Sequence, residues 1–425
     1  MAVKNLDVAN FDVKQLLLDQ TMSLSQKMNL FHRVIQESKR LKLYLYFRTT
    51  NGPSEAHIDA TTLETGEVKN MIMMASNNYL GLSTHPEVKR RTIETVEKWG
   101  IGMAGPCTLN GNTVLHQAFE DHLARFKHCE AAMLFASGYA ANIACITGLL
   151  GKNDIFIGDE LNHASLIDGA RYSGARRMVF KHSDPADLER CLKETQAETG
   201  TRLVAVDGVY SMDGEIAPLR PIVDLCKKYG AMLMVDDAHG TGAVGKTGRG
   251  SLEYCGVEGE VDIVMGTFSK AFGSFGGFLA GTHAFINWMR HFGRAGMFTA
   301  SVAPMNVAAC HAALEIMEQH PELVMRLQQN AARVRRSLRD MGFEISNHET
   351  AIIPIFIRDR ARAYGIVKEA YERGLFLSLI EYPAVAPGTE RVRLTVMATH
   401  TDADLDTAMA LLKELGQKYG VLKGS

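Results

Sequence analysis

The stretch Gly266-Thr267-Phe268-Ser269-Lys270-Ala271-Phe272-Gly273-Ser274-Phe275-Gly276-Gly277 places one lysine among small and aromatic residues, between two apolar runs. The run before it, 261–265, predicts a short buried strand, and the run 277–280 predicts another. Lys270 is therefore expected on the connection at a strand end. An ammonium group held there loses part of its hydration, which lowers its pKa and makes the amine a nucleophile toward carbonyl groups.

This stretch has other possible interpretations. A single Ser-Lys pair on a glycine-rich turn is more often an ordinary surface lysine. A phosphate-binding P-loop requires Gly-x-x-x-x-Gly-Lys-Ser/Thr, and a dinucleotide-binding fold requires Gly-x-Gly-x-x-Gly at the start of a helix. Neither spacing occurs around Lys270. The function of the lysine therefore depends on what the rest of the chain brings to it.

The composition limits the classes of protein to consider. The chain has 425 residues, 46% of them hydrophobic and 22% charged, which is typical of a globular protein. A net charge of -2 provides no basic surface for nucleic acid. Seven cysteines without Cys-x-x-Cys spacing indicate free thiols in a reducing cytoplasm, and no metal site is expected. We expect no signal peptide and no membrane span, because no apolar stretch is long enough.

The chain is predicted to have three parts: an N-terminal helix and small hairpin over 1–70, a large domain over 71–305 and a small domain over 306–425. Residues 1–47 show helical spacing with an apolar face, interpreted as packing on the body or on a second subunit. The alternative is peripheral contact with a membrane or a lipid-carrying partner. Residues 50–75 predict a hairpin with its turn at 64–67.

Short apolar runs alternate with helical stretches from about 85 to 260, which predicts βαβ units around a mostly parallel sheet. Ligands of such sheets bind outside the carboxyl ends of the strands. After Pro304 the pattern predicts a smaller α+β domain. The expected strands of the large domain are 133–136, 155–157, 178–180, 203–206 and 232–235, and those of the small domain are 352–357 and 392–396; the expected helices include 85–99, 116–126, 139–150, 219–229, 307–317, 323–341 and 402–419.

Polar residues follow several of the expected strands. Ser137, Gly138 and Tyr139 open a helix directly after a strand, which offers free backbone N–H groups and a positive helix end to a phosphate. Thr267, three residues before Lys270, adds a hydroxyl group. These residues together predict a phosphate-binding site beside the lysine.

A carboxylate and an imidazole complete this set. Asp236 follows the apolar run 231–235, where it could keep a ring nitrogen protonated or merely cap a helix. His163 follows another expected strand and could stack on a flat ring or be a buried polar residue without a function. With Lys270 for a Schiff base and a phosphate site, these are the parts that pyridoxal 5'-phosphate (PLP) requires. The sequence therefore predicts PLP as cofactor.

The chain resembles the α-oxoamine synthases from about residue 40 onward. These are PLP-dependent transferases of fold type I, the aspartate-aminotransferase fold, which join an amino acid to an acyl thioester with loss of carbon dioxide. The resemblance rests on the ordered motifs Ser76-Asn77-Asn78-Tyr79-Leu80-Gly81-Leu82, Asn162-His163-Ala164-Ser165, Tyr210-Ser211-Met212-Asp213-Gly214, Val235-Asp236-Asp237-Ala238-His239-Gly240-Thr241-Gly242, Gly266-Thr267-Phe268-Ser269-Lys270, Phe298-Thr299-Ala300-Ser301 and Arg391-Val392-Arg393-Leu394.

This resemblance implies a catalytic role for Lys270, His163, Asp236 and His239. Lys270 would hold PLP as a Schiff base and then remove the α-proton of the substrate. Asp236 would pair with the pyridine nitrogen, while His239 and Ser211 would bond to the ring oxygen. His163 would stack over the ring and assist the acid–base steps.

The resemblance also implies how the phosphate and the substrate are held. Gly138, Tyr139 and Thr267 would bind the phosphate, and Thr299 would reach it from the second subunit of a homodimer with shared active sites. Arg393 would clamp the amino-acid carboxylate with two parallel hydrogen bonds. Asn77 would help it.

One motif departs from the family. Many members carry a Gly-Ser-Arg-like triplet where this chain has Gly105-Pro106-Cys107. Without that arginine, the sequence leaves open how the acyl group or its carrier is held. Coenzyme A and an acyl carrier protein both remain candidate donors.

The expected reaction joins a small amino acid to an acyl thioester. Our first expectation is serine with a long-chain acyl-CoA, as in serine palmitoyltransferases. The alternatives are alanine with a pimeloyl thioester, as in 8-amino-7-oxononanoate synthases, and glycine with an acetyl thioester. Two other classes stay open, an aminotransferase of the same fold and a non-catalytic subunit, although the presence of Lys270, Asp236 and His163 together argues against the latter.

Overall fold

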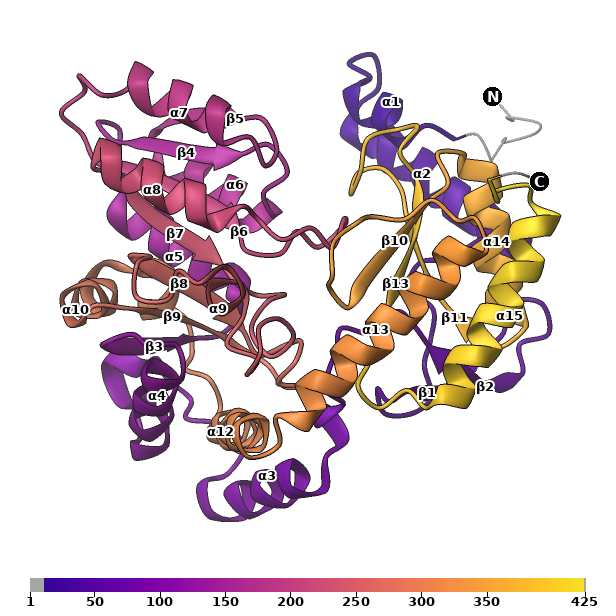
Figure 1. The fold of residues 1–425 in the computed structure, drawn as a ribbon, viewed down its shortest axis with the longest axis horizontal. Helices are drawn as coiled ribbons and strands as arrows, with labels where there is room; N and C mark the ends of the chain where they lie inside the picture. Colours follow the sequence, from indigo (N-terminus) through magenta and orange to yellow (C-terminus); the bar gives the residue numbers. More distant parts are fainter. Residues whose placement is uncertain (1–10, 424–425) are drawn as a thin grey trace.

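A seven-stranded sheet forms the centre of one half of the molecule and has the strand order β3-β9-β8-β7-β6-β4-β5 (Figure 1). The computed structural model describes residues 11–423. Every neighbouring pair is parallel except those of β9, which runs antiparallel to β3 and β8. The mostly parallel sheet is thereby confirmed. The strands are β3 Ala131–Phe135, β4 Ile155–Asp159, β5 Arg176–Phe180, β6 Arg202–Asp207, β7 Met232–Asp236, β8 Ile263–Thr267 and β9 Gly277–Gly281.

Helices cover both faces of this sheet, and its central strands are accordingly apolar on both sides. Leu203 and Ala205 of β6 pack with α5, α6 and α10, whereas Val204 and Val206 pack with α4, α7, α8 and α12. The helices and short turns of this half are α3 Pro86–Trp99, η1 Leu82–Thr84, η2 Cys107–Gly111, α4 Val114–Phe126, α5 Gly138–Leu149, α6 Ala164–Ser173, α7 Pro185–Glu194, α8 Leu219–Tyr229, α9 Ser251–Cys255, α10 His283–Phe292, α11 Arg294–Met297 and α12 Pro304–Gln319.

The C-terminal half is an α+β domain, as expected. Its antiparallel sheet has the order β10-β13-β12, and helices pack on it to form a second core. Its elements are α13 Glu322–Asp340, β10 Ile352–Phe356, α14 Arg360–Glu372, β11 Leu375–Phe376, β12 Ser378–Ile380, β13 Arg391–Thr395 and α15 Asp402–Lys418. Of these elements, α14, β11 and β12 were not predicted from the sequence.

Helix α13 runs from one half to the other (Figure 1). Val324 and Leu327, near its start, belong to the core around the large sheet, while Val334 and Leu338 belong to the second core. The apolar side chains of α12 also pack into the first core. The domain bounds 71–305 and 306–425 stay a prediction.

The predicted hairpin is present as β1 (His57–Thr61) and β2 (Val68–Met73), paired antiparallel. β11 pairs with β2 in parallel, so the hairpin joins the C-terminal half (Figure 1). The expected N-terminal helix is divided into α1 (Val13–Leu18) and α2 (Leu24–Arg40). Asp19 accepts hydrogen bonds from the backbone and hydroxyl of Thr21, and such local bonds compete with helix continuation. The part of this prediction over residues 1–10 lies outside the described residues.

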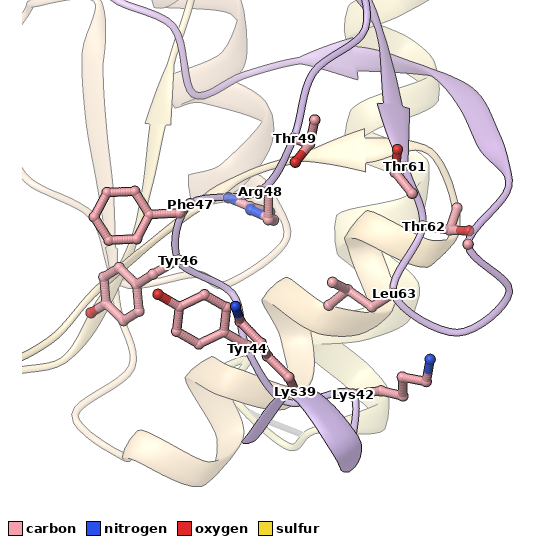
Figure 2. Close-up of a pocket in the computed structure, with 11 residues that line it drawn as sticks. Lys39, Lys42, Tyr44, Tyr46, Phe47, Arg48, Thr49, Thr61, Thr62 and Leu63 are labelled. Carbon is pink, nitrogen blue, oxygen red and sulfur yellow. The ribbon is translucent and has the colours of Figure 1, made fainter. Parts of the chain in front are cut away.

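A cavity of about 540 Å³ lies between the segment 39–49 and the turn that joins β1 to β2 (Figure 2). Lys39, Tyr44 and Tyr46 line one side of it. The guanidinium of Arg48 lies 3.9 Å from the ring centroid of Phe376 and donates to the carbonyl of Leu377 at 2.6 Å. These contacts fix the N-terminal segment on the C-terminal half, and the lining includes none of the candidate site residues.

Helix α2 is only partly covered. Val34 is buried, whereas Leu24 and Met28 are 72% and 58% exposed. Packing on the body therefore accounts for the part of the apolar face around Val34. Contact with a second subunit, or with a membrane or lipid-carrying partner, remains the prediction for the part around Leu24 and Met28. Within residues 11–423, none of the helices combines the length and apolar character that crossing a lipid bilayer requires.

Candidate active site

Lys270 lies on the loop between β8 and β9, where the sequence analysis placed it. The buried rings of Phe268 and Phe272 anchor the loop on both sides of the lysine. The backbone of Phe268 donates to Gly276 at 2.9 Å, and that of Gly273 donates to Lys270 at 2.8 Å. Gly276 has a φ of +119°, a conformation that favours glycine. These bonds hold the lysine at the carboxyl end of β8.

The environment of Lys270 makes its amine easier to deprotonate than that of an exposed lysine. Burial lowers its pKa to about 8, although the carboxylates of Asp236 and Asp207 act in the opposite direction. Among the described residues, no hydrogen-bonding partner holds its Nζ atom. A desolvated lysine without a partner suits a nucleophile better than a structural ion pair.

Two carboxylates end the neighbouring strands β6 and β7. Asp207 and Asp236 are partners in the strand register, so they occupy equivalent positions at the sheet edge. Asp236 accepts from Asn142 Nδ2 at 2.7 Å and from the backbone of Ala238 at 3.0 Å. Burial, together with the charge of Asp236, raises the pKa of Asp207 well above its usual range. The sequence analysis missed Asp207, although its place at the end of the run 203–206 could have shown it.

His163 is positioned by Asp207 directly and by Asp236 through Asn142 and Ser165. Its backbone N–H donates to Asp207 Oδ2 at 2.7 Å. Its Nδ1 lies 2.7 Å from the hydroxyl of Ser165, which itself accepts from Asn142 at 2.8 Å. Ser165 therefore donates to Nδ1, and the proton of a neutral His163 lies on Nε2. Burial lowers the pKa of His163, which favours this neutral form.

His239 lies against Tyr79, a second residue that the sequence analysis did not assign to the site. The Tyr79 hydroxyl is 2.6 Å from His239 Nδ1. Burial lowers the pKa of His239 well below its ordinary value, and the charge of Lys270 adds to the effect. Burial raises the pKa of Tyr79 to about 12. With Tyr79 as donor, His239 is neutral and carries its proton on Nε2.

The predicted phosphate site forms at the start of α5. Ser137 caps this helix by accepting from the backbone of Ala140 at 3.0 Å. An added Cβ at Gly138 would lie only 3.1 Å from Thr267 Cβ, so glycine permits the close approach of β8. Ser269 Oγ, which the sequence analysis did not select, lies 2.9 Å from Thr267 Oγ1. The helix N-terminus and the two hydroxyl groups thus lie together.

The side chain of Tyr139 has another partner. It is 44% exposed, and its hydroxyl donates to Asp168. Its ring meets that of His163 edge to face at 6.3 Å. The first turn of α5 supplies the backbone N–H of Tyr139, whereas the phenol is already held by a carboxylate.

Arg393 is buried at the boundary between the two halves. All five residues of β13 are buried, so Arg393 is not an ordinary surface arginine. Its guanidinium donates to the Ser211 carbonyl at 2.7 Å, to Thr395 Oγ1 at 2.9 Å and to Asn77 Oδ1 at 3.2 Å. Asn77 thus contacts Arg393 as expected, while Ser211 meets it through the backbone.

All of these partners are neutral. Within residues 11–423, no carboxylate forms an ion pair with Arg393. Arg391, two residues earlier on β13, is also buried but pairs with Asp213 and lies over the ring of Phe356. A buried charge without a counter-ion is costly, so Arg393 is suited to an anionic ligand.

Thr299 is separate from this cluster in the described chain, where no hydrogen bond joins it to the other candidate residues. It lies between α11 and α12, on a segment that contacts the loop containing Gly105. The backbone of Ser301 donates to Gly105 at 3.1 Å. The loop with Gly105-Pro106-Cys107, where the chain differs from the family motif, therefore lies next to the segment of Thr299.

The fold and the site together define the fold type I class of PLP enzymes. The residues fit the cofactor: a buried lysine whose pKa is lowered to about 8, a helix N-terminus with a glycine that approaches Thr267 closely, and a buried carboxylate beside them. PLP is the cofactor of this class.

The chain belongs to the aminotransferase class I and II family, whose model matches residues 69–412. It is 42% identical to an 8-amino-7-oxononanoate synthase of Alkaliphilus metalliredigens, over 91% of this chain and 97% of the relative. A solved serine palmitoyltransferase with PLP has a TM-score of 0.89 and 31% identity, and covers 94% of this chain and 100% of its own. An 8-amino-7-oxononanoate synthase of Francisella tularensis has a TM-score of 0.70 and 26% identity, over 82% and 98% of the chains.

These findings confirm the α-oxoamine synthase group, and with it a PLP-dependent acyltransferase. They favour the 8-amino-7-oxononanoate synthase alternative over our first expectation, a serine palmitoyltransferase. The structural neighbours include both names, but a shared fold does not decide a substrate. The higher sequence identity is with the former group.

Proposed function

We propose that this enzyme makes 8-amino-7-oxononanoate from alanine and a pimeloyl thioester, with release of carbon dioxide and the free thiol. The observation that carries the choice of substrates is the 42% identity with an enzyme of that name over nearly its full length. The acyl donor can be a coenzyme A or a carrier-protein thioester. We place the enzyme in the cytoplasm, in keeping with its free cysteines.

When bound, PLP withdraws electrons from the α-carbon of an amino acid and so eases loss of a proton or of carbon dioxide. In this proposal Lys270 holds the cofactor and then moves the α-proton. Asp236 would pair with the pyridine nitrogen, where its carboxylate would favour the protonated form of that nitrogen. Asn142 fixes the Asp236 carboxylate, and Asp207 fixes the backbone of His163.

The histidines take different positions in this arrangement. His163 would stack on the cofactor ring and offer its Nε2 proton to the reacting groups. His239 and Ser211 would bond to the ring oxygen, and the Tyr79 hydroxyl orients His239 for this role. Ser137, Gly138, Tyr139 and Thr267 provide the phosphate site.

Arg393 and Asn77 bind the carboxylate of alanine. The guanidinium reaches the site from the C-terminal half and contacts Ser211 of the other half. A charge-assisted pair there neutralises the buried cation and fixes the orientation of the amino acid. Which bond of the α-carbon breaks depends on that orientation.

A product panel tests the assignment. Glycine, alanine and serine are each offered with acyl thioesters of graded length, and the products are weighed by mass spectrometry. The proposal expects the highest turnover with alanine and the pimeloyl thioester. Preference for serine with a long-chain thioester would reinstate the first expectation, and release of a keto acid without thioester would indicate an aminotransferase.

Capture of PLP by the apoprotein is expected to quicken about tenfold per pH unit and to level off above about pH 8. The reason is that only the uncharged amine attacks the aldehyde, and burial lowers the pKa of Lys270 to about 8. The growth of the visible absorption band gives the rate. The same reaction with N-acetyl-lysine corrects for titration of PLP itself. A rate that still rises tenfold between pH 9 and pH 10 would contradict the lowered pKa.

We further propose a homodimer in which Thr299 serves the active site of the partner. The support is its separation from the cluster in the single chain and the family motif that contains it. A Lys270→Ala chain mixed with a Thr299→Ala chain is then expected to regain activity at limiting PLP, because one site of the mixed dimer keeps both residues. No gain on mixing, or a fully active monomer in sedimentation, would disprove sharing.

A further inference from the structure

Two histidines and a glutamate meet on the surface between α4 and α12, away from the candidate active site. His122 lies on α4, and His311 and Glu315 lie one helical turn apart on α12. Residues at this spacing project from one face of a helix. One ligand atom of each lies within 4.8 Å of the others. The three side chains are partly buried, so they remain accessible from solvent.

The distances match a tetrahedral metal site. His311 Nε2 lies 3.0 Å from His122 Nδ1 and 3.5 Å from Glu315 Oε1. Ligand atoms about 2.0–2.2 Å from a zinc ion at tetrahedral angles are about 3.3 Å apart. Two of the three separations lie on either side of that value, and all three are within 4.8 Å, so the side chains must close up around an ion. The fourth position would be open to water.

The outer contacts orient the ligands. His122 Nε2 lies 2.7 Å from Glu318 Oε2, which places the His122 proton on that nitrogen and turns the Nδ1 lone pair toward His311. Arg91 bonds the Oε2 atom of Glu315 and leaves Oε1 facing the histidines. The nearby charged groups on α3, α4 and α12 are Arg91, Arg125, Glu315 and Glu318.

We propose that His122, His311 and Glu315 bind one divalent transition-metal ion, with Zn²⁺ as the best match. Two imidazoles and one carboxylate form a donor set that zinc favours. Without an ion, the proton of the neutral His311 lies on Nε2 and is donated to His122 Nδ1. When an ion binds, His311 changes tautomer: the Nε2 proton passes to solvent and Nδ1 takes one from solvent, so the ring stays neutral. This site departs from the sequence-based expectation of no metal.

The ion would cross-link α4 to α12. The ring of His311 lies 5.4 Å from that of Phe119, which lies 5.2 Å from the Phe268 ring beside Lys270. An ion here would thus connect two helices, and the Phe119 side chain lies between it and the loop that carries Lys270. The expected effect is on stability rather than on the chemistry.

Equilibrium dialysis of the chelator-treated holoenzyme against ZnCl₂, with bound zinc measured by mass spectrometry, tests the proposal. The wild type is expected to bind one equivalent more than His311→Gln does, and to melt at a higher temperature with zinc. Glu318→Gln is expected to weaken binding about 10- to 100-fold, since outer partners of metal-bound histidines have effects of this size.

The matched control is His320→Gln. His320 lies at the end of α12 and pairs with Glu322 at 2.8 Å, but both side chains are exposed and lack a second imidazole. This variant should bind zinc like the wild type. Each variant must keep the visible absorption band and the metal-free melting temperature. Equal zinc content in the wild type and in His311→Gln would overturn the proposal, since any bound zinc would then belong to other groups such as the thiols.

Discussion

A Lys270→Ala variant is expected to lose the visible absorption band and at least about a thousandfold in turnover. Proton transfer by a positioned side chain contributes about 10²- to 10⁴-fold, and this variant also loses the covalent link to PLP. The absorption spectrum and the rate of product formation are the measurements. Because the alanine leaves Asp207 and Asp236 buried without the lysine, its melting temperature should be recorded beside the activity.

Chemical labelling provides the control. Borohydride reduction of the wild type should fix PLP on the peptide that contains Lys270. Lys246→Ala, which removes an exposed lysine, should leave both the label and the rate unchanged. A label recovered on a different lysine would show that the site is assigned wrongly.

An Arg393→Ala variant is expected to keep the PLP absorption band but to bind alanine about ten- to more than a hundredfold more weakly. A hydrogen bond between a charged donor and its partner is worth about 1.5–3 kcal/mol, which corresponds to that loss of affinity. Titration with alanine, followed by the change in the visible band, measures it. An unchanged affinity would exclude Arg393 as the carboxylate clamp.

Arg391→Ala is the matched control, since it removes the same side chain from the same face of β13. Arg391 already has Asp213 as a partner, so its loss leaves that carboxylate partly buried and unpaired. We expect lower stability with alanine affinity unchanged within a few-fold. The two variants together separate a substrate contact from a structural ion pair.

Much of the fold could be predicted because the central strands of the large sheet are apolar along most of their length. The large-sheet strands lie within two residues of the predicted bounds, since runs such as 203–206 are buried on both faces. The antiparallel direction of β9 was not predicted, although its helix-free connection from β8 is too short for the crossover that parallel neighbours need. Asp207 was not predicted as a site residue because its place beside Asp236 results from the pairing of β6 with β7.

The residues of the site could be predicted more readily than the contacts between them. Lys270, Asp236 and His163 follow strands, so a general rule for parallel sheets placed them together. The bridge of Asn142 and Ser165 between Asp236 and His163 joins helices from different parts of the sequence, and no local pattern predicts it. Arg393 was assigned by resemblance, while its burial results from packing between the two halves.

The continuous helix α13 has a consequence for how the molecule unfolds. Because Val324 serves one core and Leu338 the other, neither half can melt without exposing part of a helix that the other half still needs. The two cores should lose their structure in one cooperative transition. A fragment that ended at residue 305 would lack the apolar side chains of α12 that cover the sheet, and it should aggregate rather than fold.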